Sequence, residues 1–136
     1  MTYKLVDHTA DIAVEATGET LGNAFAAAAD GMAAAICDEI PDTGDRISIE
    51  AEGESKEAAL FEYLDELILQ RDVQHILPVD NTAKVTEVNG NWIVEASTRG
   101  VPLSEVTARE IKAVTYSEMN VAKTDDSWSL YVVFDV

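Results

Sequence analysis

The stretch TLGNAFAAAADGMAAAI, residues 20–36, carries the clearest periodic signal in the chain. Its apolar residues recur at the three- and four-residue spacing of one helical face. They are Leu21, Ala24, Phe25, Ala28, Met32, Ala35 and Ile36. Thr20 can cap the helix, because its hydroxyl can accept a hydrogen bond from an N–H of the first turn. The stretch therefore predicts a helix with one apolar stripe, ending before the turn residues at 41–45.

A second periodic stretch occupies residues 56–71. Ser55 is a suitable N-cap, and the charge of Glu57 is favourable at the positive start of a helix. The apolar stripe of this helix consists of Leu60, Tyr63, Leu64, Leu67 and Ile68. We therefore expect two main helices.

The remaining apolar segments have the alternation of strands. They cover residues 3–6, 12–16, 47–51, 84–88, 92–96, 111–121 and 127–136. Asn89-Gly90 separates two of them and predicts a hairpin, because both turn positions favour positive φ. Asp125-Asp126 indicates a second hairpin. Residues 102–109 fit either a short helix capped by Ser104 or a loop.

The order of these elements predicts an α+β fold. We expect a mostly antiparallel sheet with the two main helices packed on one face. A chain of 136 residues is the usual size of one domain. No internal repeat, linker or low-complexity tract is evident, so residues 1–136 are expected to form a single domain.

The charge of the chain is strongly acidic. It has 26 acidic and 9 basic side chains, a formal net charge of −17, and 47% hydrophobic residues. Direct binding to nucleic acid needs a basic surface, and so does attraction to an anionic membrane. We therefore expect neither. The acidity is spread along the chain, which indicates a halophilic source, where about 1 M salt screens charges beyond roughly 3 Å. An acidic mesophilic protein is the alternative.

Cys37 is the single cysteine, so no intramolecular disulfide can form, and we expect it to be a small buried side chain. No segment approaches the roughly 20 apolar residues of a membrane span. The first residues lack the apolar core of a signal peptide. We expect a cytoplasmic protein.

Carboxylates gather at two separate places in the sequence. Asp7 and Asp11 lie in the polar segment DHTAD, and Asp135 precedes Val136 after an apolar strand. Oxygen ligands suit Ca²⁺, Mg²⁺ or Mn²⁺. If the fold brings the two places together, they can form one site for a hard cation. The structural alternative is a polar turn at Asp7–Asp11 and a capping role for Asp135.

Few other residues offer chemistry. His8 could be a ligand, a general base or a hydrogen-bonded turn residue. Lys112 lies within an apolar run, where it can serve function or guard the edge of a sheet. Trp92 and Trp128 are expected to pack on the core. The sequence contains no phosphate-binding loop, no zinc motif and no serine-nucleophile motif.

Three segments in this order resemble the archease family. They are DHTADI at residues 7–12, EIKAVTY at 110–116 and VVFDV at 132–136. The segment YLDELIL at 63–69 is similar to the family's helical pattern, with Tyr63 and Asp65 in place of Trp and Asn. Ser117 departs from the family, which often has His there. The resemblance covers nearly the whole chain.

This resemblance implies a small α+β protein that assists an RtcB-type RNA ligase in tRNA splicing. Such a protein promotes guanylylation of the ligase from GTP and its repeated turnover, and is not itself an enzyme. The family's metal site, usually described with calcium, carries over onto Asp11, Asp135 and a main-chain or terminal oxygen of Val136. The family's functionally important lysine carries over onto Lys112.

Two other functions remain open from the residues themselves. One is a small divalent-metal-dependent hydrolase that uses Asp11, Asp135 and His8. The other is a general chaperone with an exposed apolar groove. Catalysis without a partner would favour the first, and suppression of aggregation of unrelated proteins would favour the second.

Overall fold

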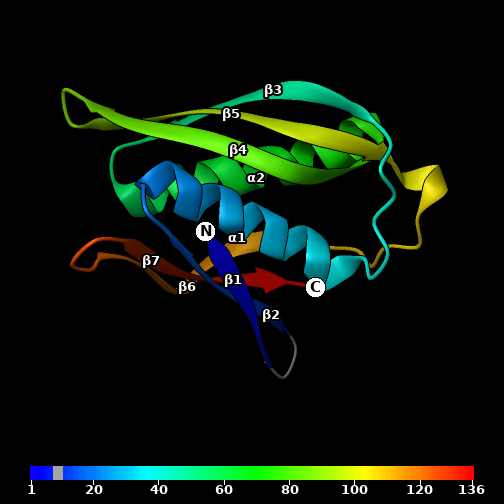
Figure 1. Cartoon of the computed structure of the whole chain (residues 1–136), viewed down its shortest axis with the longest axis horizontal. Helices are drawn as coiled ribbons and strands as arrows, with labels where there is room; N and C mark the ends of the chain where they lie inside the picture. The colour runs from blue at the N-terminus through cyan, green and yellow to red at the C-terminus, as the bar shows by residue number, and fades with distance from the viewer. Residues whose placement is uncertain (8–10) are drawn as a thin grey trace.

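The computed structural model describes residues 1–7 and 11–136, and it places two helices between two β-sheets (Figure 1). The elements in chain order are β1 (Thr2–Asp7), β2 (Asp11–Gly18), α1 (Leu21–Ile36), β3 (Asp45–Gly53), α2 (Lys56–Gln74), β4 (Ile76–Val88), β5 (Asn91–Pro102), a 3-10 turn (Leu103–Glu105), β6 (Ala113–Lys123) and β7 (Trp128–Asp135). Neither helix combines the length and apolar content needed to cross a membrane.

The seven strands divide into two antiparallel sheets. One has the order β1-β2-β7-β6, and the other has the order β3-β5-β4. Helix α1 contacts β2 of the first sheet and β4 of the second, while α2 contacts β6 and β3. The α+β class is confirmed. The expected single sheet is instead two sheets, and each covers the helices from one side (Figure 1).

Helix α1 is buried on almost all sides because it lies between the two sheets. The sequence predicted one apolar stripe, but most of its alanines are at most 1% exposed. A Cβ on Gly22 would overlap the carbonyl oxygen of Ala83 on β4, whereas a Cβ on Gly31 would meet Val14 on β2 and Tyr3 on β1. Nine residues turn a helix by about 900°, which places these glycines on opposite faces. Small residues on both faces let the sheets approach the helix.

Helix α2 completes the core. Its stripe residues Leu60, Leu64 and Leu67 are fully buried, and the ring of Tyr63 stacks on Phe25 of α1 with centroids 6.0 Å apart. Both predicted N-caps are confirmed, because the hydroxyls of Thr20 and Ser55 accept hydrogen bonds from the third residue beyond, at 3.0 Å each. Cys37 and the two tryptophans also pack against this core, as predicted.

The element ends differ from the expectations where backbone geometry decides them. Helix α2 runs three residues beyond the predicted end, to Gln74, and stops at His75 in the left-handed region. Strand β4 begins at Ile76, before the predicted residue 84, and β5 ends at Pro102, after the predicted residue 96. These added segments pair with each other. Asn89-Gly90 forms the predicted turn with φ of 53° and 86°. Residues 103–105 form a 3-10 turn without a side-chain cap.

The structure also reveals an internal repeat that the sequence analysis did not find. Residues 12–20 read IAVEATGET, and residues 47–55 read ISIEAEGES. Five of these nine positions are identical, and each segment runs along a strand into the N-cap of a helix. The repeat is a β-strand followed by its helix, displaced by 35 residues.

Strand register supports the repeat independently. Gly18 of β2 faces Trp128 of β7, and Gly53 of β3 faces Trp92 of β5. In both halves the strand–helix unit therefore pairs with a later hairpin whose second strand has tryptophan as its first or second residue. One half is β2, α1, β6 and β7, and the other is β3, α2, β4 and β5. Strand β1 is additional and belongs to the first half alone.

Asp30 is the one charged residue on α1, and it anchors a bulge in β4. Its Oδ1 accepts hydrogen bonds from the backbone N–H and the side-chain amide of Asn81, at 3.0 and 2.9 Å. The register of β4 shifts between Val79 and Thr82 at this point. Burial raises the pKa of the Asp30 carboxyl above its usual 3.8, although the hydrogen bonds from Asn81 oppose this effect. Burial also raises the pKa of Tyr63 far above its usual range.

Removing the charge of Asp30 is expected to change the pH dependence of stability. Because its pKa is raised on folding, its contribution is present below pH 3.8 and is lost as pH rises through the folded pKa. Asp30→Asn keeps the acceptor oxygen and should be at least as stable as the wild type at pH 7. Asp30→Ala leaves two buried donors of Asn81 unpaired and should lose about 1–3 kcal/mol. Urea unfolding between pH 4 and 7 measures both, and a neutral-pH loss in Asp30→Asn like that of Asp30→Ala would contradict this account.

The approach of α1 to β4 predicts the effect of one added methyl group. Gly22→Ala should lower the free energy of unfolding by about 1–3 kcal/mol, because the new Cβ overlaps backbone that cannot move aside cheaply. The neighbouring substitution Asn23→Ala adds no atoms and gains helix propensity, so it should not lower stability. Thermal unfolding compares the two variants. A more stable Gly22→Ala protein would mean that propensity outweighs the contact.

Candidate functional site

The structure brings the two predicted carboxylates together at one end of the four-stranded sheet. Asp11 at the start of β2 faces Asp135 at the end of β7 in the antiparallel register. On the other side of β7, Ala113 of β6 also faces Asp135, and the Lys112 N–H donates a hydrogen bond to the Asp135 carbonyl at 2.9 Å. The sequence segments that were singled out separately are therefore neighbours in space.

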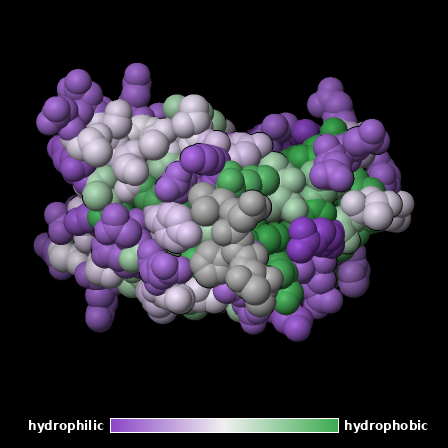
Figure 2. Space-filling view, turned by 90° about the horizontal axis from the view of Figure 1, so that it is seen from below, coloured by the Kyte–Doolittle hydropathy of each residue, from purple (hydrophilic) through white to green (hydrophobic). Residues whose placement is uncertain are grey.

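Asp11 and Asp135 share the outer face of the sheet. The adjoining pair, Ile12 and Phe134, packs against the core, so the carboxylates point away from the helices. Side chains directly opposite one another have Cβ atoms about 4.5–5.5 Å apart. Figure 2 views the molecule from this side and shows hydrophilic residues around the rim with apolar residues among them.

The pair lies at the boundary between a buried row and solvent. Two residues along, Ala13 faces Val133 on the same face, and these side chains are 0% and 2% exposed. Asp11 is half-buried and Asp135 is exposed, so water reaches the pair. Like charges directly opposite each other destabilise an antiparallel pair. A cation held between the carboxylates of Asp11 and Asp135 would remove that repulsion.

The internal repeat offers a comparison for this pair. Asp11 corresponds to Arg46 of β3, and Asp135 corresponds to Arg99 of β5, which also face each other. Asp80 joins these two arginines. Its carboxylate accepts hydrogen bonds from Arg99 at 2.8 and 2.6 Å, and its carbonyl accepts one from Arg46 at 2.6 Å. In the second half, the negative charge of Asp80 thus pairs with Arg99, while its backbone carbonyl binds Arg46.

The other predicted site residues lie close to the carboxylates. Lys112 is exposed and directly precedes β6, one residue from the Ala113–Asp135 pairing. Val136 is half-buried and packs against the core. Ser117 lies in the interval between Thr115 and Asn120, where the β6–β7 register shifts.

The set of possible metal ligands is small. His8 lies outside the described residues. Among the side chains that the structure describes, those of residues 1–5 and 11–136, no three of His, Cys, Asp or Glu gather where they could hold a metal ion. Two facing carboxylates supplemented by a main-chain oxygen would make a site of few protein ligands, with oxygen donors that suit Ca²⁺, Mg²⁺ or Mn²⁺.

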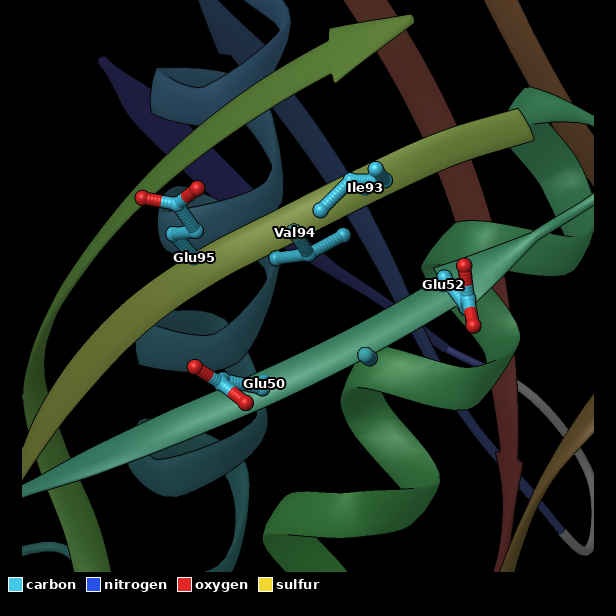
Figure 3. Close-up of a pocket in the computed structure, with 6 residues that line it drawn as sticks. Glu50, Glu52, Ile93, Val94 and Glu95 are labelled. Atoms are coloured by element: carbon cyan, nitrogen blue, oxygen red, sulfur yellow. The ribbon is translucent and has the colours of Figure 1, made fainter. Parts of the chain in front are cut away.

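A second acidic surface, which sequence reasoning missed, follows β3. Carboxylates of Glu50 and Glu52 on β3 and of Glu95 on β5 surround a hollow of about 420 Å³ (Figure 3). A neighbouring hollow of about 330 Å³ lies between β3 and α2. Comparing residues 12–20 with 47–55 in the sequence would have revealed the repeat and shown that β3 corresponds to β2.

Together, the fold and the carboxylate pair define a class: a small acidic α+β protein with facing aspartates at the ends of two central strands. The sequence profile described as the archease protein family matches residues 3–136. The chain belongs to the archease family.

Individual relatives agree with this assignment. "Protein archease" of Archaeoglobus fulgidus is 35% identical, with 100% of each chain covered. "Protein archease" of Pyrococcus furiosus is 31% identical over 96% of this chain and 95% of that one. The solution structure of protein 1598 of Methanobacterium thermoautotrophicum has a TM-score of 0.85 and 25% identity, with 98% of each chain covered. The Thermotoga maritima structure, described as an archease and possible chaperone, shares the fold, with a TM-score of 0.64, 22% identity, and 98% and 96% coverage.

Neutralising one aspartate tests the electrostatics of the pair. Asp135→Asn should stabilise the protein by up to about 1 kcal/mol in the presence of a chelator, because it removes a facing like charge. The variant should also lose any rise in Tm that Ca²⁺ gives the wild type. Glu15→Gln is the matched control, since Glu15 lies on the same face of β2 but faces Lys4 and Tyr131. Equal calcium responses in Asp135→Asn and wild type would contradict a cation at this pair.

Proposed function

We propose that this chain is a metal-binding accessory protein that activates an RtcB-type RNA ligase. It would promote guanylylation of the ligase from GTP and repeated turnover, and would not catalyse ligation itself. The observation that carries the proposal is the pairing of Asp11 with Asp135 beside Lys112, on a chain that belongs to the archease family.

The proposed cation is Ca²⁺, with Mg²⁺ or Mn²⁺ as alternatives. Asp11 and Asp135 would hold it through their carboxylates, and Val136 would add a main-chain oxygen. The Arg46–Asp80–Arg99 arrangement supports this assignment, because two like charges face each other at the corresponding strand positions and one of them, Arg99, pairs with the opposite charge of Asp80. When bound, the cation would supply positive charge that can interact with phosphate oxygens.

Lys112 is proposed to contact the ligase or its nucleotide phosphates. Its exposed side chain is a compact point charge on a flexible stem, and its backbone is fixed by the hydrogen bond to Asp135. The lysine would bind phosphate oxygens of the nucleotide, and the neighbouring carboxylate pair would bind a divalent cation. Both are present in the active centre of a metal-dependent ligase that uses GTP. The net charge of −17 makes the ligase protein, rather than its RNA, the expected contact surface.

The alternatives receive less support from the geometry. A metal-dependent hydrolase would need further ligands or a base, and none gathers with the aspartate pair among the described residues. A general chaperone needs a broad apolar surface. The exposed large apolar side chains of the described residues are spread over several elements. They include Tyr3, Ile40, Val73, Val88 and Tyr116.

A guanylylation assay with the cognate ligase, limiting GTP and divalent metal tests the proposal. Lys112→Ala should fold, retain its calcium response and fail to stimulate the ligase. Its stability should change by less than about 1 kcal/mol, because the side chain is exposed. Lys123→Ala is the matched control at the far end of β6, roughly 30 Å along the strand, and should stimulate fully.

Full stimulation by Lys112→Ala would remove the lysine from the proposal. If the wild type leaves ligase guanylylation unchanged at every metal concentration, the activator function itself is wrong. Hydrolysis of phosphate esters by the pure protein would instead favour the enzyme.

A further inference from the structure

The two halves of the repeat differ at one edge. In the first sheet, β1 pairs with the outer side of β2, so the order is β1-β2-β7-β6. In the second sheet, β3 corresponds to β2, and within the described chain no strand pairs with its outer side. The position that β1 fills in one half is therefore open in the other.

Strand β1 shows what belongs in such a position. It pairs antiparallel with β2, and Lys4 faces Glu15. It also covers α1, where Gly31 leaves room for Tyr3. The fourth strand thus contributes backbone pairing, one basic partner for a strand glutamate, and cover for a helix.

The corresponding positions in the second half are acidic. Displaced by 35 residues, Glu15 becomes Glu50 and Gly31 becomes Glu66. Both line the 330 Å³ hollow between β3 and α2, together with Glu62 and the 51%-exposed Leu69. The hollow occupies the place where β1 lies on α1 in the first half.

Charge indicates what can fill this place. Glu50 faces Glu95 across β3 and β5, and Glu52 stands two residues along on the same face (Figure 3). On the other side of β5, Lys84 of β4 faces Glu95 and is the one basic residue in the row formed by Glu50, Glu95 and Lys84. A second copy of the chain would bring the same glutamates and a further charge of −17 to the edge. A basic segment is complementary to it.

The regularity of β3 also suits pairing. All nine of its residues keep register with β5 without a shift. By contrast, the edge strand β6 is interrupted by a bulge between Thr115 and Asn120, where Glu118 has φ of 58°. Bulges protect sheet edges from further pairing. Strand β3 has charge in place of a bulge. Glu50 and Glu52 in its second half disfavour acidic partners and favour basic ones, while Arg46 in its first half is bound to Ser97 and Asp80.

We infer that the outer edge of β3 binds an extended, lysine- or arginine-rich segment of a partner protein as a fourth, antiparallel strand. Backbone hydrogen bonds to β3 would provide affinity, as in other cases of strand addition. A basic side chain facing Glu50 would repeat the Lys4–Glu15 pairing, and others would reach Glu62 and Glu66 on α2. This surface is separate from Asp11 and Asp135 and does not depend on a cation.

A labelled synthetic peptide tests the inference on the full chain at one fixed salt concentration. The probe is a nine-residue peptide that repeats lysine-lysine-valine, which places lysines on both faces of a strand and matches the length of β3. The same peptide with glutamate for lysine is the peptide control. Fluorescence anisotropy gives the affinity, and hydrogen exchange measured by NMR gives the protection of the backbone amides of β3.

We expect the lysine peptide to bind and to slow exchange within residues 45–53. Glu50→Lys with Glu66→Lys should weaken binding by at least about tenfold, because both sides of the edge lose their complementary charge. Asp125→Lys with Asp126→Lys, in the exposed β6–β7 turn, makes the same change in net charge and should bind as the wild type does. Circular dichroism checks that each variant folds, and Glu50→Gln with Glu66→Gln replaces the lysine variant if it does not.

Three results would overturn the inference. The first is equal weakening in the two charge-reversed variants, which would reduce binding to overall charge. The second is absence of binding, or binding without protection of β3. The third is a dimer in sedimentation that protects β3 without peptide, which would identify a second copy as the occupant.

Discussion

The structure depends on one packing constraint, which is that α1 must fit between two sheets. A helix with large side chains on two faces would hold the sheets too far apart to share a core. Gly22 and Gly31 lie on opposite faces and meet β4 on one side and β1 and β2 on the other, while buried alanines occupy much of the rest. This close approach places β2 on the core, and the pairing of β2 with β7 then sets Asp11 opposite Asp135.

The second organising feature is the pairing of like charges at equivalent ends of the two sheets. Such pairs are unfavourable unless an opposite charge joins them. Asp80 joins the arginine pair, and its place in the β4 bulge is fixed because the neighbouring Asn81 is bound by Asp30 of the central helix. The aspartate pair has the reverse charge at the corresponding strand positions, and its carboxylate oxygens are the donors that hard cations prefer.

The repeat also explains why the two proposed surfaces lie where they do. The aspartate pair is at the end of the first sheet, and the acidic hollow between β3 and α2 follows the open edge of the second. The core leaves little freedom for function, because its helices are covered from both sides. Strand ends and an unpaired edge are the places where polar groups can be presented without disturbing that packing.

The sequence by itself determined both helices, their caps, the Asn89-Gly90 turn and the α+β class. It also identified Asp11, Lys112 and Asp135 as candidate site residues. These are local properties, set by periodicity, hydroxyl caps and turn geometry, or recognised as family motifs. Only the tertiary structure decided that the strands form two sheets, that α1 is buried on almost all sides, and that β3 has an open edge. Those features depend on which strands pair across the chain, and alternation along one strand does not specify its partner.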